Sequence, residues 1–180
     1  MQNIYFTRHG ETKWNVQKKI CGSVDVPLTE LGKSQAYTLG KEIISRNLHI
    51  DKILCSPLQR TVTTAEIASD ITGIPFEIDD RLREENFGTF EGTQIGQERF
   101  YLAKKDFIYS FETGESVLKV AQRLYNLLDE LRLNYSNNNF LLISHNGLAR
   151  VIHSYFYDMT NEEFDNYHIK NCEIIEYTFL

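Results

Sequence analysis

The sequence has few prolines, few cysteines and no long apolar run. Among its 180 residues are 3 prolines, 3 cysteines and 1 tryptophan. No apolar run is long enough to cross a bilayer, and Met1-Gln2-Asn3 lacks the basic start of a signal peptide. The odd number of cysteines and their scattered positions argue against a disulfide framework and against a cysteine-based metal site. We therefore expect buried or half-buried thiols in a cytoplasmic protein.

An excess of positive charge is also missing. The formal net charge is −6, with 42% hydrophobic and 24% charged residues, which is ordinary for a globular domain. This balance argues against nucleic acid or an acidic membrane as a partner, so any anion site must be local. The length suits a single domain over residues 1–180. The sequence does not indicate an oligomeric state.

Short apolar runs alternate with longer amphipathic segments along the chain. We predict strands at about 4–7, 52–55, 75–78, 140–143 and 172–179. Helices are expected at about 30–46, from 58 to before Gly73, 116–133 and 147–156, with a short one capped by Thr160 and a weak one at 94–106. This alternation predicts an α/β three-layer sandwich: a mostly parallel central sheet with helices on both faces. Residues 93–115 would form a short cap.

Polar side chains follow four of these strands. Arg8 and His9 end the first strand, Arg60 lies beyond the second, Glu84 follows the third, and His145 ends the fourth. Carboxyl ends of parallel strands meet at one sheet edge, so we expect these groups to converge. Two arginines and two imidazoles together require an anion with several oxygens, and phosphate suits them. A metal is the weaker explanation, because thiolate or carboxylate ligands at short spacing are missing and arginines repel cations.

Four ordered segments carry a resemblance to a known family. They are Arg8-His9-Gly10-Glu11-Thr12-x-Trp14-Asn15, Ser56-Pro57-Leu58-x-Arg60, Arg81-Leu82-x-Glu84-x-x-x-Gly88-x-x-Glu91-Gly92 and Ser144-His145-x-Gly147. Together they resemble the motifs of the histidine phosphatase superfamily, also called the phosphoglycerate mutase-like family. Several motifs in the right order are a far stronger signal than any one of them.

The resemblance implies roles for the catalytic candidates. His9 would accept the phosphoryl group, while Arg8, Arg60 and His145 would offset the charge on its oxygens. Glu84 would be the proton donor. Fixed guanidinium groups would supply the positive charge, so no metal and no cofactor are expected.

Three further residues are assigned to the phosphate pocket. Asn15 would donate an amide hydrogen bond, although a turn or helix cap also explains it. Gly22 would let a backbone N–H approach the ligand. Asn146 stands where the family commonly has glycine.

The protonation of Glu84 is left open by the sequence. Glu84 must carry a proton for the first step, which a substrate phosphate favours and the arginines disfavour. Glu85 is the rival donor on chemical grounds alone, and the family register favours Glu84.

Phosphatase is our predicted activity, with a small phosphate ester as substrate. Mutases of the family have an arginine-bearing insertion after the third motif, whereas residues 93–115 lack an adjacent arginine pair. Arg99, Lys104 and Lys105 are explained as a helix surface. A mutase, or a catalytically weak module that binds a phospholigand or phosphoprotein, remains the alternative.

The aromatic segment at 100–111 has two explanations. Its rings, Phe100, Tyr101, Phe107, Tyr109 and Phe111, would form the core of a cap or would line a pocket for a bulky leaving group. We favour the cap core. The identity of the substrate, whether α-ribazole phosphate, a sugar phosphate or another ester, is not indicated.

Overall fold

A central sheet of five strands organises the computed structural model, which describes residues 2–179. The strands are β1 (Asn3–Arg8), β2 (Lys52–Cys55), β3 (Phe76–Ile78), β4 (Phe140–Ser144) and β5 (Ile174–Thr178). Their spatial order is β3-β2-β4-β1-β5. The first four are parallel, and β5 runs antiparallel to β1 at the edge. The prediction of a mostly parallel sheet is confirmed.

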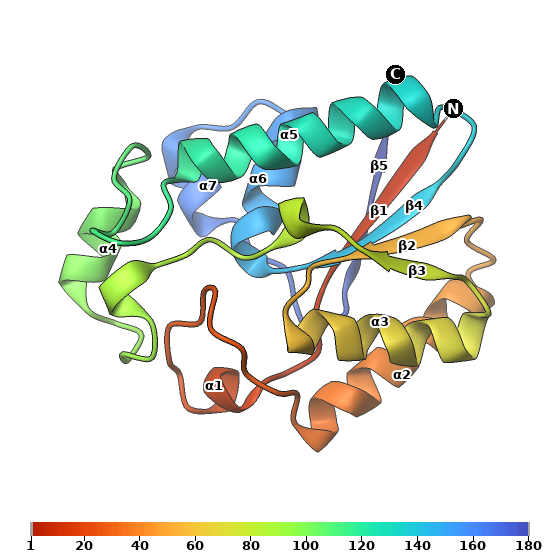
Figure 1. The fold of residues 1–180 in the computed structure, drawn as a ribbon, viewed down its shortest axis with the longest axis horizontal. Helices are drawn as coiled ribbons and strands as arrows, with labels where there is room; N and C mark the ends of the chain where they lie inside the picture. Colours follow the sequence, from red (N-terminus) through yellow and green to blue (C-terminus); the bar gives the residue numbers. More distant parts are fainter. Residues whose placement is uncertain (1, 180) are drawn as a thin grey trace.

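Helices cover both faces of the sheet, which confirms the predicted three-layer sandwich (Figure 1). One face carries α2 (Glu30–Ser45) and α3 (Gln59–Thr72), and the other carries α5 (Val117–Asn134), α6 (Asn146–Phe156) and α7 (Asn161–Asn166). The Thr29 side chain caps α2 by accepting from Gly32 N–H, and Thr160 forms a capping box with Glu163 at α7. Helix α3 stops at Gly73, whose φ of 74° is left-handed.

Side chains of the central strands alternate between two apolar layers. On β1, Ile4 and Phe6 join the cluster beneath α5 and α6, while Tyr5 joins the cluster beneath α2 and α3. On β4, Leu142 joins the cluster beneath α5 and α6, and Ile143 joins the cluster beneath α2 and α3. This period of two follows from strand geometry, and burial on both faces explains the unbroken apolar run of β4.

Two short helices differ from the prediction. Helix α1 (Lys13–Val16) was not predicted, because four residues are too few to show an apolar period. Helix α4 (Glu98–Lys104) is shorter than the predicted 94–106. The segment between β3 and α4 holds two 3-10 turns, at Asp80–Leu82 and Gly88–Phe90, and is otherwise irregular as expected.

The segment around α4 lies beyond the carboxyl ends of the strands (Figure 1). Phe100 and Phe111 of this segment join Ile20, Phe87 and Phe90 in a small separate cluster, with Tyr109 packed against it. The favoured explanation, a cap core, therefore accounts for three of the five rings. Phe107 packs against the main core, and Tyr101 lines a cavity that Phe100 also borders, so the pocket explanation accounts for part of the segment too. No helix within residues 2–179 is long and apolar enough to span a bilayer.

The two faces of α5 give a test of the core. Leu127 is fully buried on this helix, whereas Leu133 is 75% exposed. Leu127→Ala should lower the free energy of unfolding by about 2 to 5 kcal/mol, because it removes buried methyl groups and leaves a cavity. Leu133→Ala should change it by less than about 0.5 kcal/mol. Urea denaturation measures both, and equal losses would contradict the assigned register of α5.

Candidate active site

A cavity of about 280 Å³ opens at the carboxyl ends of β1 and β4. Its lining includes five of the predicted site residues, namely Arg8, His9, Asn15, Glu84 and Asn146. Arg60 and His145 lie behind this lining, at 1% and 0% exposure. The fold therefore brings together residues that lie far apart in the sequence, the most distant of them being Arg8 and His145, 137 positions apart.

The His9 ring is neutral and its orientation is fixed. Its Nδ1 lies 2.7 Å from the Gly10 carbonyl oxygen, which assigns the proton to Nδ1 and leaves the lone pair on Nε2. Burial lowers the pKa of His9 well below its usual range, and the charges of Arg60 and Arg8 lower it further. The ring centroid lies 5.3 Å from that of His145. An unprotonated ring nitrogen is what a nucleophilic histidine needs.

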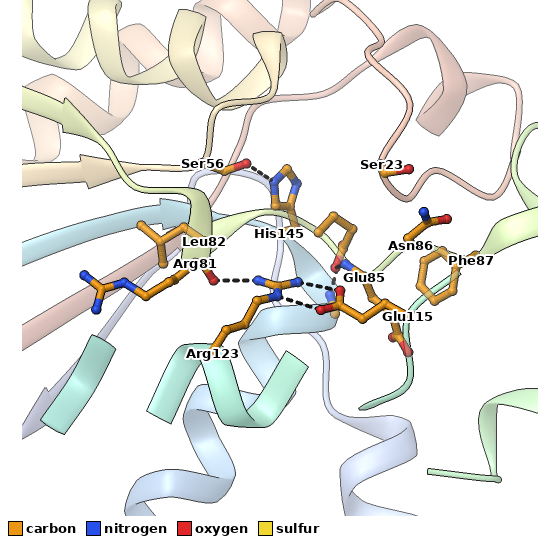
Figure 2. Close-up of polar contacts among 12 residues, drawn as sticks. Ser23, Ser56, Arg81, Leu82, Glu85, Asn86, Phe87, Glu115, Arg123 and His145 are labelled. Atoms are coloured by element: carbon orange, nitrogen blue, oxygen red, sulfur yellow. Dashed lines mark hydrogen bonds and ion pairs between the residues drawn. The ribbon is translucent and has the colours of Figure 1, made fainter. Parts of the chain in front are cut away.

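Arg60 and His145 are bonded to each other. Arg60 Nε–H donates to His145 Nδ1 at 3.2 Å, so His145 carries its proton on Nε2. Figure 2 shows the contact of this ring with Ser56, in which Nε2–H donates to Oγ at 2.8 Å. Nη2 and Nη1 each donate one N–H, to the carbonyls of Gly22 and Val24 at 2.7 and 2.9 Å, which leaves two N–H bonds of the guanidinium for a ligand. Burial lowers the pKa of His145 well below its usual range, with Arg60 adding to the effect. The pair is thus a cation beside a neutral imidazole.

Gly22 has a structural contact that was not predicted. Its carbonyl, not its N–H, makes the contact with Arg60. A Cβ at Gly22 would lie 2.4 Å from Glu91 Oε1 and 2.5 Å from the Glu85 carbonyl oxygen. Glycine therefore lets two loops cross in contact. A role for its N–H in binding phosphate remains a prediction.

The Glu84 carboxyl group is held at the cavity by two backbone N–H groups. Oε1 accepts from Glu85 at 2.9 Å and Oε2 accepts from Gly147 at 3.1 Å. A Cβ at Gly147 would lie only 2.3 Å from Glu84 Oε1. The absence of a side chain at Gly147 is what allows the carboxyl group to reach the start of α6.

The segment that carries Glu84 is tied to the rest of the domain. Arg123 of α5 donates to the Arg81 carbonyl and forms an ion pair with Glu115 at 2.9 Å (Figure 2). Ser144 Oγ–H donates to the Leu82 carbonyl at 2.7 Å. These contacts fix an otherwise irregular loop against α5 and β4, and so they position the Glu84 carboxyl group.

Asn15 and Asn146 each use the amide oxygen of the side chain for a contact within the protein. Asn15 Oδ1 accepts from Thr12 N–H at 3.0 Å in a capping box, so the capping explanation is confirmed. Asn146 Oδ1 accepts from Ile169 N–H at 3.1 Å. In each amide the oxygen is occupied and the Nδ2 donor remains for a ligand. Their binding of phosphate stays a prediction.

The cavity lining also includes Lys104 and Arg150, which were not predicted as site residues, and Glu85, which was considered only as the rival proton donor. The explanation of Lys104 as part of a helix surface was wrong, because the cap folds back over the site and turns this residue toward it. A signal for Arg150 was available in the sequence. It lies four residues, about one helical turn, after Asn146 on α6 and so shares its face.

The buried imidazoles make the stability depend on pH. His9 and His145 have lowered pKa values in the folded protein, so below about pH 6.5 the unfolded chain binds protons that the folded one does not. The free energy of unfolding should fall as the pH falls, by up to about 1.4 kcal/mol per pH unit for each ring.

This dependence is measurable as a difference between variants. Urea unfolding between pH 6.5 and 5 should show a shallower slope for His9→Gln than for the natural chain. His49→Gln, at an exposed histidine, should keep the natural slope. A His9→Gln slope equal to the natural one would mean that His9 is not held neutral.

Comparisons with known proteins agree in one family. The family model described as histidine phosphatase superfamily (branch 1) matches residues 4–180. A protein of Erwinia tasmaniensis named as a probable phosphoglycerate mutase GpmB is 34% identical over 97% of this chain and 83% of its own length. A protein of Yersinia pestis with the same name is 35% identical, over 83% of this chain and 71% of its own.

Solved structures show the same fold. Bacillus stearothermophilus YhfR superposes with a TM-score of 0.86 at 28% identity, over 98% of this chain and 90% of its own. A mycobacterial glucosyl-3-phosphoglycerate phosphatase gives 0.86 at 24% identity, with the same coverage. A putative α-ribazole-5′-phosphate phosphatase of Escherichia coli gives 0.82 at 24% identity, over 97% and 89% of the two chains.

Proposed function

Because the chain belongs to the histidine phosphatase superfamily, branch 1, we propose that it is a phosphomonoester hydrolase acting on a small phosphorylated metabolite. The observation that carries the proposal is the neutral His9 ring, oriented by its Nδ1 contact with Gly10, on the wall of a cavity that Arg8 and Glu84 also line. A nucleophile, a cation and a carboxyl group then face one space. No metal or cofactor is part of the proposed mechanism.

The first step transfers the phosphoryl group to the enzyme. The lone pair of His9 Nε2 attacks phosphorus, and the bond from phosphorus to the ester oxygen breaks. Glu84, protonated, gives its proton to that oxygen, and the alcohol leaves. Arg8 and Arg60 offset the negative charge of the transferred group through fixed positive charge, which needs no reorganisation during the reaction.

The second step returns the enzyme to its starting state. The Glu84 carboxylate takes a proton from water, whose oxygen attacks the phosphohistidine. The bond between phosphorus and Nε2 breaks, inorganic phosphate is released, and His9 is again neutral. The low pKa of the buried ring favours this neutral form as the leaving group.

Phosphoglycerate mutase activity is the second candidate, because proteins with that name are 34 and 35% identical to this chain. A mutase must exclude water from the phosphohistidine. Residues 93–115 contain a single arginine, Arg99, which is exposed and pairs with Glu112. The arginine pair expected of a mutase is missing, which supports the hydrolase. Conversion of 3-phosphoglycerate to 2-phosphoglycerate after priming with the bisphosphate would favour the mutase.

Hydrolysis of p-nitrophenyl phosphate in EDTA tests the proposed chemistry. His9→Ala should abolish it, because the nucleophile is gone, whereas His49→Ala should retain it. Brief reaction with a labelled substrate should trap an acid-labile phosphohistidine in the natural chain and none in His9→Ala. Residual activity in His9→Ala would exclude His9 as the acceptor, and loss of activity in the chelator would overturn the metal-free mechanism.

The contact between Glu84 and Gly147 gives a second test. Gly147→Ala should lower kcat about 100-fold, since the added Cβ displaces the Glu84 carboxyl group and general acid catalysis is worth about that much. Glu84→Gln should cause a loss of similar size. Combining the two should add little, because both remove one interaction. If the two reductions in kcat multiply in the double variant, Gly147 acts independently of Glu84.

A further inference from the structure

A group of charged residues lines the cavity without taking part in the proposed chemistry. Glu85 comes from the loop after β3, Lys104 from α4 and Arg150 from α6. Glu85 and Arg150 are only 5% and 9% exposed. Lys104 lies at the boundary with an outer cavity of about 630 Å³, to which it also belongs. We call these three residues the distal cluster.

The distal cluster is unsatisfied by the protein itself. Glu85 Oε1 and Arg150 Nε are buried and have no hydrogen-bond partner within residues 2–179. Arg150 Nη1 makes one long contact, 3.5 Å to the Asp165 carbonyl oxygen, and its guanidinium lies 5.8 Å from the Phe164 ring. Buried polar atoms without partners are costly, so such atoms on a cavity wall indicate a ligand.

The cluster is electropositive at neutral pH. The pKa of Glu85 is raised to about 8, mainly by burial and also by the neighbouring Glu84 charge. The pKa of Lys104 is lowered to about 8, mainly by burial and also by the Arg150 charge. At pH 7 most Glu85 side chains are therefore protonated, while Lys104 and Arg150 are mostly charged.

Other charges face the cluster from the surrounding elements. Glu84 and Glu115 add negative potential at Glu85, and Asp165 of α7 does so at Lys104. Within residues 2–179, neither Lys104 nor Arg150 has a carboxylate oxygen within 4.0 Å. The two cations consequently remain available to an anion in the cavity.

We propose that Lys104 and Arg150, with Glu85 beside them, form a second anion subsite that binds a carboxylate on the alcohol portion of the substrate. The subsite is distinct from the phosphoryl site at His9 and rests on the proposed phosphatase function. A monoanion fits better than a second phosphate, because an ionised Glu85 repels a dianion more strongly than a carboxylate. Protonated Glu85 in turn donates a hydrogen bond to a carboxylate oxygen.

Matched substrate pairs test this subsite. Glycerol 3-phosphate and 3-phosphoglycerate differ in a carboxylate, as do phenyl phosphate and 4-carboxyphenyl phosphate. In at least one pair the natural chain should have a kcat/KM about tenfold higher for the carboxylate ester. Lys104→Gln should remove most of this preference through KM and leave the uncharged ester within twofold of its natural rate. Arg150→Gln, checked for folding by thermal unfolding, should do the same.

The matched control is Arg99→Gln, on the same helix as Lys104. Arg99 is exposed and paired with Glu112 at 3.1 Å, so its loss should keep the preference intact. If Arg99→Gln lost as much of the carboxylate preference as Lys104→Gln, the effect would come from the overall charge of the cap, and the subsite would be overturned. A preference for fructose 1,6-bisphosphate over fructose 6-phosphate, without one for either carboxylate ester, would overturn the choice of a carboxylate.

The pH dependence tests the part played by Glu85. Between pH 7 and 9 the natural preference should fall, because Glu85 ionises and Lys104 loses its proton. Glu85→Gln, which stays neutral, should match the natural preference at pH 7 and exceed it at pH 9. A lower preference than the natural one at pH 9 would remove Glu85 from the subsite.

A binding measurement separates this inference from the proposed function. Calorimetric titration of the His9→Ala variant with 3-phosphoglycerate and glycerol 3-phosphate compares the two ligands without turnover. Tighter binding of the carboxylate, lost in the His9→Ala/Lys104→Gln double variant, would support the subsite even if no ester is hydrolysed. The opposite result is also informative. If the natural chain hydrolyses p-nitrophenyl phosphate but neither the ester pairs nor the titration shows a preference for the carboxylate, the proposed function stands and the subsite is overturned.

Discussion

A buried guanidinium without a carboxylate partner is the constraint on which the site depends. Arg60 is 1% exposed, and within residues 2–179 no carboxylate oxygen lies within 4.0 Å of it. Three of its five N–H bonds donate to the carbonyls of Gly22 and Val24 and to the His145 ring. An unpaired buried cation attracts an anion. The same charge helps to keep His9 and His145 neutral, so in the proposed function one residue would serve both the binding of phosphate and the nucleophile.

Close approach of backbone segments gives the site its precision. Gly22 lets its loop cross the segment of Glu85 and Glu91, and Gly147 lets the Glu84 carboxyl group reach the start of α6. A side chain at either position would meet atoms at 2.3 to 2.5 Å. The catalytic groups are therefore held by packing between loops as well as by the sheet, which explains how irregular segments can carry an ordered site.

In the proposed function, two separate parts of the structure recognise the substrate, namely the sheet edge and the cap with α6. The strand ends present His9 and the arginines around it, which are suited to any phosphoryl group. The cap and α6 supply Lys104 and Arg150, which face the region that the rest of the substrate would occupy. Because the two sets come from different elements, the second can vary without disturbing the first.

The sequence alone determined the fold class and the catalytic candidates. Apolar periodicity indicated the parallel sheet, and the order of Arg8-His9, Arg60, Glu84 and His145 at strand ends predicted their convergence, because parallel strands end at one edge. Only the tertiary structure decided how these groups contact each other, that Gly22 acts through its carbonyl, and that Lys104 faces the cavity. The physical reason is that such contacts depend on loop crossings and on the folding back of the cap, which join residues far apart in the chain and leave no local period in the sequence.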